Sequence, residues 1–351
     1  MMESFVDALI KEIELQKNYF QPQTHLESIY LGGGTPSLLS AKDLDRIFTA
    51  LHRHFNILPE AEITLEANPD DLTKELLSHW KNIGINRLSL GLQSVIQKDL
   101  SFMHRVHNAQ QSLAAVDLIR GSGFELFTLD FIYGIPLTGM QGWLKNLDFL
   151  KTASPPHFSA YALTVEPRTR LYKDIQTGKN PGPDEQEITE QFLILQEFSM
   201  QNGYDAYEIS NYARPGYRAI HNSSYWYQKP YLGLGPAAHS FSHKIRKANS
   251  ADIKSYIANL LEKQQLPEAE IEELTIQNQT NEWIMTRLRL AEGISIQEYL
   301  EISGHSLESR TKDILNKFIT LGYLTKSTSH YKLTSNGKLH ADGIAAELFW
   351  E

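Results

Sequence analysis

Hydrophobic and polar residues alternate with two different periods along the first half of the chain, which predicts helices and strands in turn. Apolar residues recur at helical spacing in the segments 3–18, 40–55, 73–84, 108–123 and 141–153. Between them lie short apolar runs of strand type at 28–34, 61–69, 86–94, 126–134 and 157–165. Five strands that alternate with helices indicate a parallel sheet, because parallel neighbours need crossover connections.

The second half of the chain differs from the first in composition, and its composition changes again after the aromatic-rich segment. Residues 166–186 are rich in Pro, Gly and charge and predict a linker, and a helix is expected at 187–203. Residues 204–241 are dense in aromatic side chains without clear periodicity, which is typical of strands and loops that cover a barrel or a site. Amphipathic helices at 281–293, 295–304 and 309–324 follow, and then either a hairpin turning at Asn336–Gly337 or a strand running into a final helix. This order predicts a small, mainly helical, winged-helix-like domain at 246–351 after a larger domain at 1–245.

Polar residues and glycines stand where the predicted strands end. They are Gly32, Gly33, Gly34, Thr35, Glu66, Asn68, Gln93, Asp130 and Tyr133. A single polar residue there can simply cap the next helix. Several of them at the carboxyl edge of one parallel sheet predict a ligand site. The glycines fit neither the dinucleotide nor the P-loop spacing, but a glycine loop lets an amino-acid-like ligand pair with backbone N–H and C=O groups.

Composition narrows the classes of function. The net charge of −9 argues against a general nucleic-acid binder. No apolar run approaches the ~18 residues that span a bilayer, and the acidic first residues predict an amphipathic helix instead of a signal peptide. We therefore expect a cytoplasmic protein with at most peripheral membrane contact. The chain contains no cysteine, which excludes disulfides and any iron–sulfur cluster held by its own thiolates.

Nine segments resemble, in order and spacing, the radical S-adenosylmethionine (SAM) proteins related to oxygen-independent coproporphyrinogen III oxidase. They are YLGGGTPSLLS, LEANPDDL, NRLSLGLQS, HRVH, LDFIYGIP, SAYALTVEPRT, YEISNYA, HNSSYW and GLGPAAHSF. Two of them, HNSSYW and YEISNYA, are most similar to the HemW-type branch, the haem chaperones. The resemblance covers most of the chain and implies a partial (β/α) barrel of the TIM-like, radical SAM type.

The resemblance also implies a SAM pocket at the strand ends. Its residues would be Gly33, Gly34, Thr35, Glu66, Gln93, Arg105 and Asp130. The first three would hold the amino group of the SAM methionine, and Glu66 would contact the ribose or the ammonium. Arg105 would pair with the carboxylate, for which a planar guanidinium is suited, and Gln93 or Asp130 would bind ribose hydroxyls.

A haem site is implied by the HNSSYW segment. His221 could bind haem iron axially, and Asn222, Tyr225 and Trp226 accompany it, with the two aromatic rings against the porphyrin. The residues alone equally allow a hydrogen-bonded structural histidine with aromatic side chains that only pack. Both interpretations stay open at this point.

The sequence departs from the family at its defining feature, a C-x-x-x-C-x-x-C loop whose thiolates hold a 4Fe–4S cluster. The chain has no such loop and begins at the helix that should follow it. It could be a fragment or misassigned start of a complete protein, a paralogue that lost catalysis and kept porphyrin or partner binding, or an unrelated use of the scaffold. Without the first strand of the family, segment 28–34 is expected to be an unpaired sheet edge that favours association, such as dimerisation.

The function expected from the resemblance is that of a haem chaperone of the radical SAM class, which binds haem and SAM and passes haem to acceptor proteins. The alternatives are a coproporphyrinogen III oxidase-like enzyme of porphyrin biosynthesis and a non-catalytic paralogue without a cluster. The chain as written is not expected to cleave SAM reductively, because oxygen or nitrogen ligands do not give a cluster of sufficiently low potential.

Overall fold

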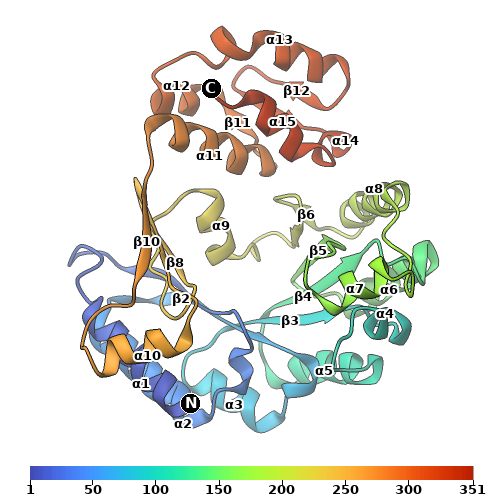
Figure 1. The fold of residues 1–351 in the computed structure, drawn as a ribbon. Helices are drawn as coiled ribbons and strands as arrows, with labels where there is room; N and C mark the ends of the chain where they lie inside the picture. Colours follow the sequence, from blue (N-terminus) through green and yellow to red (C-terminus); the bar gives the residue numbers. More distant parts are fainter. Residues whose placement is uncertain (351) are drawn as a thin grey trace.

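A seven-stranded sheet forms the centre of the larger part of the molecule in the computed structural model, which describes residues 1–350 (Figure 1). Its strands, in spatial order, are β1 (Leu26–Leu31), β2 (Ile57–Ala67), β3 (Arg87–Gln93), β4 (Leu126–Tyr133), β5 (His157–Ala162), β7 (Asn211–Ala213) and β6 (Asp205–Ala206). The first five are parallel, as predicted. Two short antiparallel strands extend the sheet beyond β5. With three and two residues, they are too short to carry a periodic signal.

Helices cover one face of this sheet. They are α1 (Met2–Leu15), α2 (Ala41–His54), α3 (Lys74–Asn82), α4 (Gln97–Phe102), α5 (Ala109–Ser122), α6 (Gly139–Ala153) and α8 (Glu185–Gln201). Ser40, Thr73 and Asn108 begin α2, α3 and α5, and each side chain accepts a hydrogen bond from the third backbone N–H of its helix. The predicted linker 166–186 instead contains a short helix, α7 (Arg170–Gln176).

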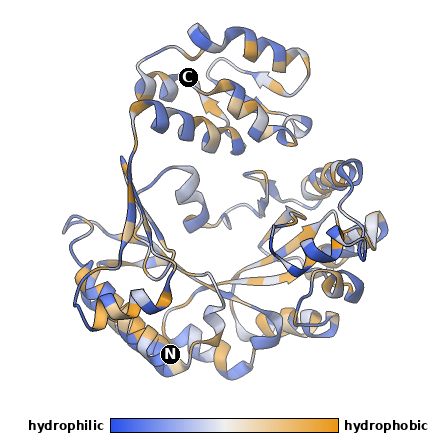
Figure 2. Cartoon of the chain, in the orientation of Figure 1, coloured by the Kyte–Doolittle hydropathy of each residue, from blue (hydrophilic) through white to orange (hydrophobic). Residues whose placement is uncertain are grey.

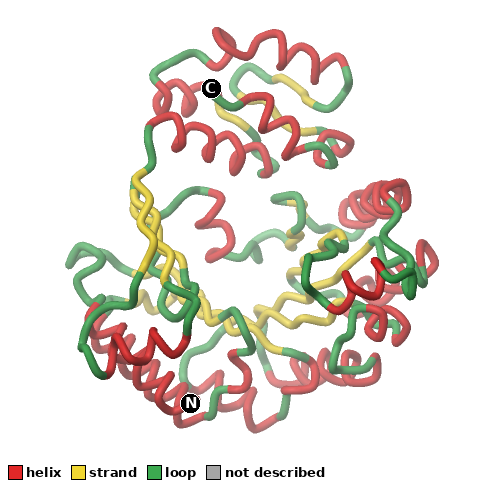
Figure 3. The backbone as a smooth tube through the Cα atoms, viewed as in Figure 1, coloured by secondary structure: helices red, strands yellow, loops and turns green. Residues whose placement is uncertain are grey.

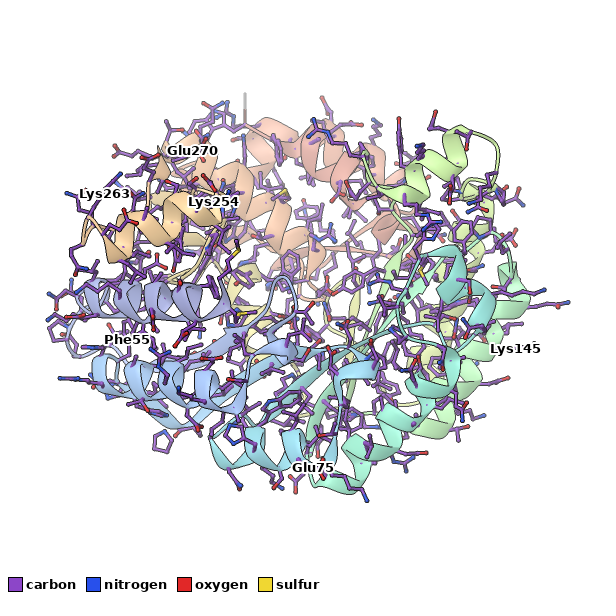
Figure 4. All side chains as sticks on the ribbon, turned by 60° about the horizontal axis from the view of Figure 1, so that its bottom comes forward. Phe55, Glu75, Lys145, Lys254, Lys263 and Glu270 are labelled. Atoms are coloured by element: carbon purple, nitrogen blue, oxygen red, sulfur yellow. The ribbon has the colours of Figure 1, made fainter. Side chains whose placement is uncertain are left out.

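The two faces of the sheet differ sharply in polarity. On the outer face, Ile63, Leu65, Leu88, Leu129 and Phe158 pack against the helices in one apolar core. The inner face, opposite those helices, carries the alternate residues of the same strands, and most of them are polar. Charged side chains gather on the outside of the molecule, where Glu75, Lys145, Lys254, Lys263 and Glu270 point away from the body (Figure 4).

The aromatic-rich segment contains one helix that was not predicted. This helix, α9 (Ile220–Trp226), lies over the inner face, between the sheet and the C-terminal part (Figure 1). It is only seven residues long and has no fully buried side chain, so no apolar period marks it in the sequence.

A three-stranded antiparallel sheet of β8 (His239–Ser242), β9 (Ile245–Asn249) and β10 (Ala269–Glu273) follows, with α10 (Ile253–Leu261) in one of its connections. It runs from the large sheet up to the C-terminal part (Figure 3). Residue 245, the expected end of the first domain, is the first residue of β9, so this sheet spans the expected limit. Glu12 of α1 connects the first helix to this three-stranded sheet and to α10. Its buried carboxylate accepts hydrogen bonds from Gly235, Asn249 and Tyr256.

The C-terminal part is mainly helical with a small sheet. It comprises α11 (Ile276–Arg289), β11 (Ile294–Ser295), α12 (Ile296–Ser303), α13 (Leu307–Thr320), β12 (Leu324–Lys326), β13 (His330–Leu333), α14 (Ser335–Lys338) and α15 (Ala341–Leu348). It has an apolar core of its own, around Trp283, Leu288, Tyr299 and Phe318. Hydrophobic positions, in orange, accordingly recur between hydrophilic ones along its helices (Figure 2).

The predicted hairpin at Asn336–Gly337 is wrong, and the alternative of a strand running into a helix is correct. Both residues belong to α14, which directly follows β13, while the hairpin turn lies at residues 327–329. A Cβ on Gly337 would come within 1.9 Å of the Tyr323 carbonyl oxygen. The glycine therefore allows a close backbone approach and does not form the turn.

Candidate functional site

Polar side chains from six of the seven strands of the large sheet line its inner face. They are Ser28 and Tyr30 of β1, Glu62, Thr64 and Glu66 of β2, Arg87 and Ser89 of β3, Thr128 and Asp130 of β4, His157, Ser159 and Tyr161 of β5, and Asn211 of β7. Because side chains of a strand alternate between faces, the same strands can bury apolar residues outside and present this polar surface inside. Sequence reasoning missed most of these residues, although the alternation itself, as in EITLE and TLD, was available.

Glu66 connects the end of β1 with the end of β2. Its carboxylate accepts hydrogen bonds from the backbone N–H of Gly33 at 3.0 Å and from the Tyr30 hydroxyl at 2.8 Å. Burial and the neighbouring carboxylate of Glu66 raise the pKa of Tyr30, so the phenol stays protonated and donates. A Cβ on Gly32 would lie 2.5 Å from the Tyr30 ring and 2.9 Å from Glu66, so this position leaves little room for a side chain.

Asp130 lies on the same inner face, two strands from Glu66. It accepts a hydrogen bond from the Ser89 hydroxyl at 2.9 Å, and Ser89 is the register partner of Glu66. Burial raises the pKa of Asp130 to about 6, hydrogen bonding from serine side chains opposes that shift, and the charge of Glu66 adds to it. The structure therefore brings Gly33, Glu66 and Asp130 to one edge of the inner face.

The backbone is left-handed at three of the predicted SAM residues. Gly33 and Gly34 have φ values of 75° and 59°, with no heavy atom near the place of a Cβ. Gln93, at the end of β3, has a φ of 64°, which is uncommon for a residue other than glycine and frequent at functional sites. Thr35 is half-buried at the start of a short 3₁₀ helix, Pro36–Leu38.

Arg105 follows α4 in a loop that reaches the end of β3, because Nε2 of the nearby His107 lies 3.2 Å from the backbone oxygen of Leu92. Arg105 itself is exposed, and its guanidinium forms no ion pair with any of residues 1–350. The preceding His104 instead pairs with Asp174 of α7, with 2.9 Å between Nε2 and Oδ2. The guanidinium of Arg105 is thus available to a ligand carboxylate, and no hydrogen bond or ion pair joins it to the other predicted SAM residues.

A buried ion pair holds the beginning of α9 on the inner face. Glu62 and Arg87 are each 3% exposed, with 3.4 Å between Oε2 and the guanidinium. The Glu62 carboxylate also accepts the backbone N–H groups of Ile220 and His221, at 3.0 and 2.9 Å. These two N–H groups have no partner within the helix, so the carboxylate both pairs with Arg87 and satisfies the helix end.

His221 is held on both sides of its ring. Nδ1 lies 3.0 Å from the Ser28 hydroxyl, and Nε2 lies 3.0 Å from the Tyr225 hydroxyl. The Tyr30 ring stacks on the imidazole at 4.7 Å between centroids. Burial lowers the pKa of His221 to about 4, so the ring is neutral at pH 7 and carries one nitrogen lone pair.

The other predicted haem residues lie in different surroundings. Tyr225 contacts His221, and its ring also meets Tyr231 edge-on. Trp226 instead lies against the C-terminal part, with the Arg289 guanidinium 5.5 Å from its ring. Asn222 is half-buried in the first turn of α9. The structure therefore brings Tyr225, but not Trp226, to the imidazole.

Known proteins match this chain over nearly its whole length. The profile of the Radical SAM superfamily matches residues 7–150, and that of the HemN C-terminal domain matches residues 274–340. The haem chaperone HemW of Bacillus subtilis is 32% identical, over 90% of this chain and 84% of that protein. HemW of Escherichia coli is 30% identical, over 99% of this chain and 90% of that protein. The chain belongs to the HemW haem chaperone family.

The fold is also that of a solved relative of the HemW family. Coproporphyrinogen III oxidase (HemN) from Escherichia coli, described as a radical SAM enzyme, superposes with a TM-score of 0.85. The superposition covers 99% of this chain and 83% of that one, at 20% identity, which shows a shared fold. None of the helices in the described part of the chain combines the length and apolarity needed to cross a bilayer.

The residues present fit SAM and do not fit a cluster. The radical SAM superfamily implies SAM and an iron–sulfur cluster, but this chain has no cysteine to supply a thiolate. Within residues 1–350 no three His, Asp or Glu side chains gather as a metal site either. The open backbone at Gly33 and Gly34, beside the carboxylates of Glu66 and Asp130, suits the amino and hydroxyl groups of SAM.

Proposed function

We propose that this chain binds haem through His221 and passes it to haem-accepting proteins. Its relatives from Bacillus subtilis and Escherichia coli are named haem chaperones, which supports this proposal. The observation that carries the proposal is the position of His221 on the inner face, where Ser28 and Tyr225 flank its two ring nitrogens and burial lowers its pKa to about 4, so that the ring is neutral at pH 7. A neutral imidazole is the form that binds iron. We expect this transfer to take place in the cytoplasm.

We further propose that SAM occupies the edge of the inner face where β1, β2, β3 and β4 end. The backbone N–H of Gly34 and the Thr35 hydroxyl would hold the methionine end. Glu66 and Asp130 would accept hydrogen bonds from the ammonium or the ribose hydroxyls, as carboxylates do. The groups of SAM that such a site can bind are its amino-acid end, its sulfonium and its ribose. We derive no reductive step for this chain, since no residue fits a thiolate-bound cluster.

Haem binding is tested by titrating the full chain with haemin and recording the Soret band. We expect a shifted band at one equivalent for the parent protein and a loss of that band, or at least tenfold weaker binding, for His221→Ala. His239→Ala is the matched control, since His239 lies on β8 and is exposed. Equal binding by the parent protein and His221→Ala would overturn the role of His221.

SAM binding is tested by calorimetry on the parent protein and on Asp130→Ala and Glu66→Gln. Both variants are expected to bind more weakly, by about tenfold for each charge-assisted hydrogen bond lost. Glu60→Gln on the same strand as Glu66 is exposed and serves as the control. Unchanged affinity in both site variants would show that SAM binds elsewhere.

A further inference from the structure

We propose that Tyr225 and Ser28 control His221 from its two sides: Ser28 holds the Nδ1 proton, and the Tyr225 hydroxyl occupies Nε2, the nitrogen that binds iron, until haem displaces it. This inference rests on the proposed role of His221 in haem binding. It adds Ser28 on β1 and Tyr225 on α9. From the geometry around the ring, we expect the Ser28 hydroxyl to strengthen haem binding and the Tyr225 hydroxyl to weaken it.

The roles of the two hydroxyls follow from their acidity. A neutral imidazole has one N–H donor and one lone pair. A phenol is a stronger hydrogen-bond donor than an aliphatic hydroxyl, because the aromatic ring draws electron density from its O–H bond. Tyr225 therefore donates to Nε2 across 3.0 Å, and Nδ1–H donates to the Ser28 oxygen across 3.0 Å. This assignment places the lone pair on Nε2.

The surroundings fix the ring but leave the Tyr225 side open. Tyr30 stacks on the imidazole, and Glu62 holds the backbone N–H of His221, so the histidine stays in place when one partner leaves. Tyr225 is 42% exposed, so its side chain can turn toward solvent without opening the core. Haem that approaches Nε2 must break the Tyr225 hydrogen bond, whereas the Ser28 hydrogen bond can persist.

Ser28 corresponds to the outer-shell partner that most metal-binding histidines have. A ligating imidazole almost always donates its second N–H to an oxygen, which fixes the tautomer and makes the ring a better ligand. Ser28 supplies that oxygen from β1, a strand 193 residues away in the sequence.

The test is a haemin titration of the full chain and of four variants, with the Soret band as the readout. Tyr225→Phe keeps the ring and removes the hydroxyl, and we expect about fivefold tighter binding, the factor that corresponds to one net hydrogen bond. Tyr172→Phe, a similarly exposed tyrosine on α7, is the control and is expected to equal the parent protein. Ser28→Ala is expected to bind more weakly, and Ser28→Thr to restore binding, because threonine keeps the hydroxyl.

A spectroscopic measurement separates positioning from simple stability. Resonance Raman spectra of the reduced haem complex report the iron–imidazole stretch, whose frequency falls when the second ring N–H loses its acceptor. We expect a lower frequency in Ser28→Ala and an unchanged one in Ser28→Thr and Tyr225→Phe.

The outcomes distinguish this inference from the proposed function. If His221→Ala binds haem like the parent protein, the histidine is not the ligand and both proposals fail. If His221→Ala loses binding while Tyr225→Phe binds no more tightly than Tyr172→Phe, the role of Tyr225 is wrong and that of His221 stands. Weaker binding by Tyr225→Phe would mean that the hydroxyl holds the haem instead of competing with it. An unchanged stretch in Ser28→Ala would overturn the role of Ser28.

Discussion

The carboxylate of Glu62 accepts the backbone N–H of His221 at 2.9 Å, across 159 residues of sequence. The same carboxylate pairs with Arg87 at 3.4 Å, and both side chains are almost completely buried. The Glu62 side chain on β2 thereby connects the inner face of the sheet with the beginning of α9. The position of the proposed haem ligand depends on this buried charge.

Glu62→Gln is expected to lower the free energy of unfolding by about 3 kcal/mol or more, because it leaves the Arg87 charge buried without a partner. Urea denaturation followed by circular dichroism measures the change. Glu60→Gln, on the exposed part of β2, is expected to change stability by less than about 0.5 kcal/mol. The double variant Glu62→Gln, Arg87→Met should recover part of the loss. Equal midpoints for Glu62→Gln and Glu60→Gln would contradict the role of the pair.

The pKa of Asp130 predicts a pH dependence of stability. The pKa is raised from 3.8 to about 6 by burial, so the folded protein holds a proton that the unfolded chain releases between these values. Its contribution is fully present below about pH 4 and is lost as pH rises through 6, on the order of 2 to 3 kcal/mol. Unfolding free energies at several pH values should show this decline in the parent protein and not in Asp130→Asn. Asp148→Asn, on the exposed face of α6, should keep the parent slope.

Gly34 offers a test of the SAM loop in which strain and binding can be separated. Gly34 and Gly178 have φ values of 59° and 70°, and neither has a heavy atom near the place of a Cβ. Alanine at either position should therefore cost about 1 kcal/mol of stability through backbone strain. Only Gly34→Ala is expected to weaken SAM binding in calorimetry, because only Gly34 lies beside Glu66. If Gly178→Ala weakened it equally, strain alone would explain the effect.

Arg289 is expected to fix the end of α9 to the C-terminal part. Its guanidinium lies 5.5 Å from the Trp226 ring and pairs with Asp342 at 2.8 Å. In Arg289→Ala, hydrogen exchange of the α9 amides should become faster, since the last turn loses this contact. Arg310→Ala removes a similar contact, with Trp350 within the C-terminal part, and should leave α9 unchanged. Unchanged exchange in Arg289→Ala would mean that the remaining contacts of α9, such as the hydrogen bond from Arg287 to the Trp226 carbonyl, hold the helix without Arg289.

Local patterns in the sequence were enough to predict the five parallel strands, the helices between them and the cluster of Gly33, Glu66 and Asp130 at their ends. These features follow from local periodicity and from the rule that parallel strands end at one edge. Gln93 and Thr35 were placed at the same edge by the same rule, whereas Arg105 stands in a loop and was implied only by the resemblance to the family.

The surroundings of His221 could not be predicted from local patterns, because they come from segments that are distant in the sequence. Ser28 and Glu62 contact His221 from 193 and 159 residues away in the sequence. Helix α9 has no buried residue, so no apolar period predicts it. Nor could the sequence distinguish Tyr225, which touches the imidazole, from Trp226, which packs under Arg289. Periodicity records which face of an element is buried, but it does not record the partner that buries it. That partner is chosen by the packing of distant segments.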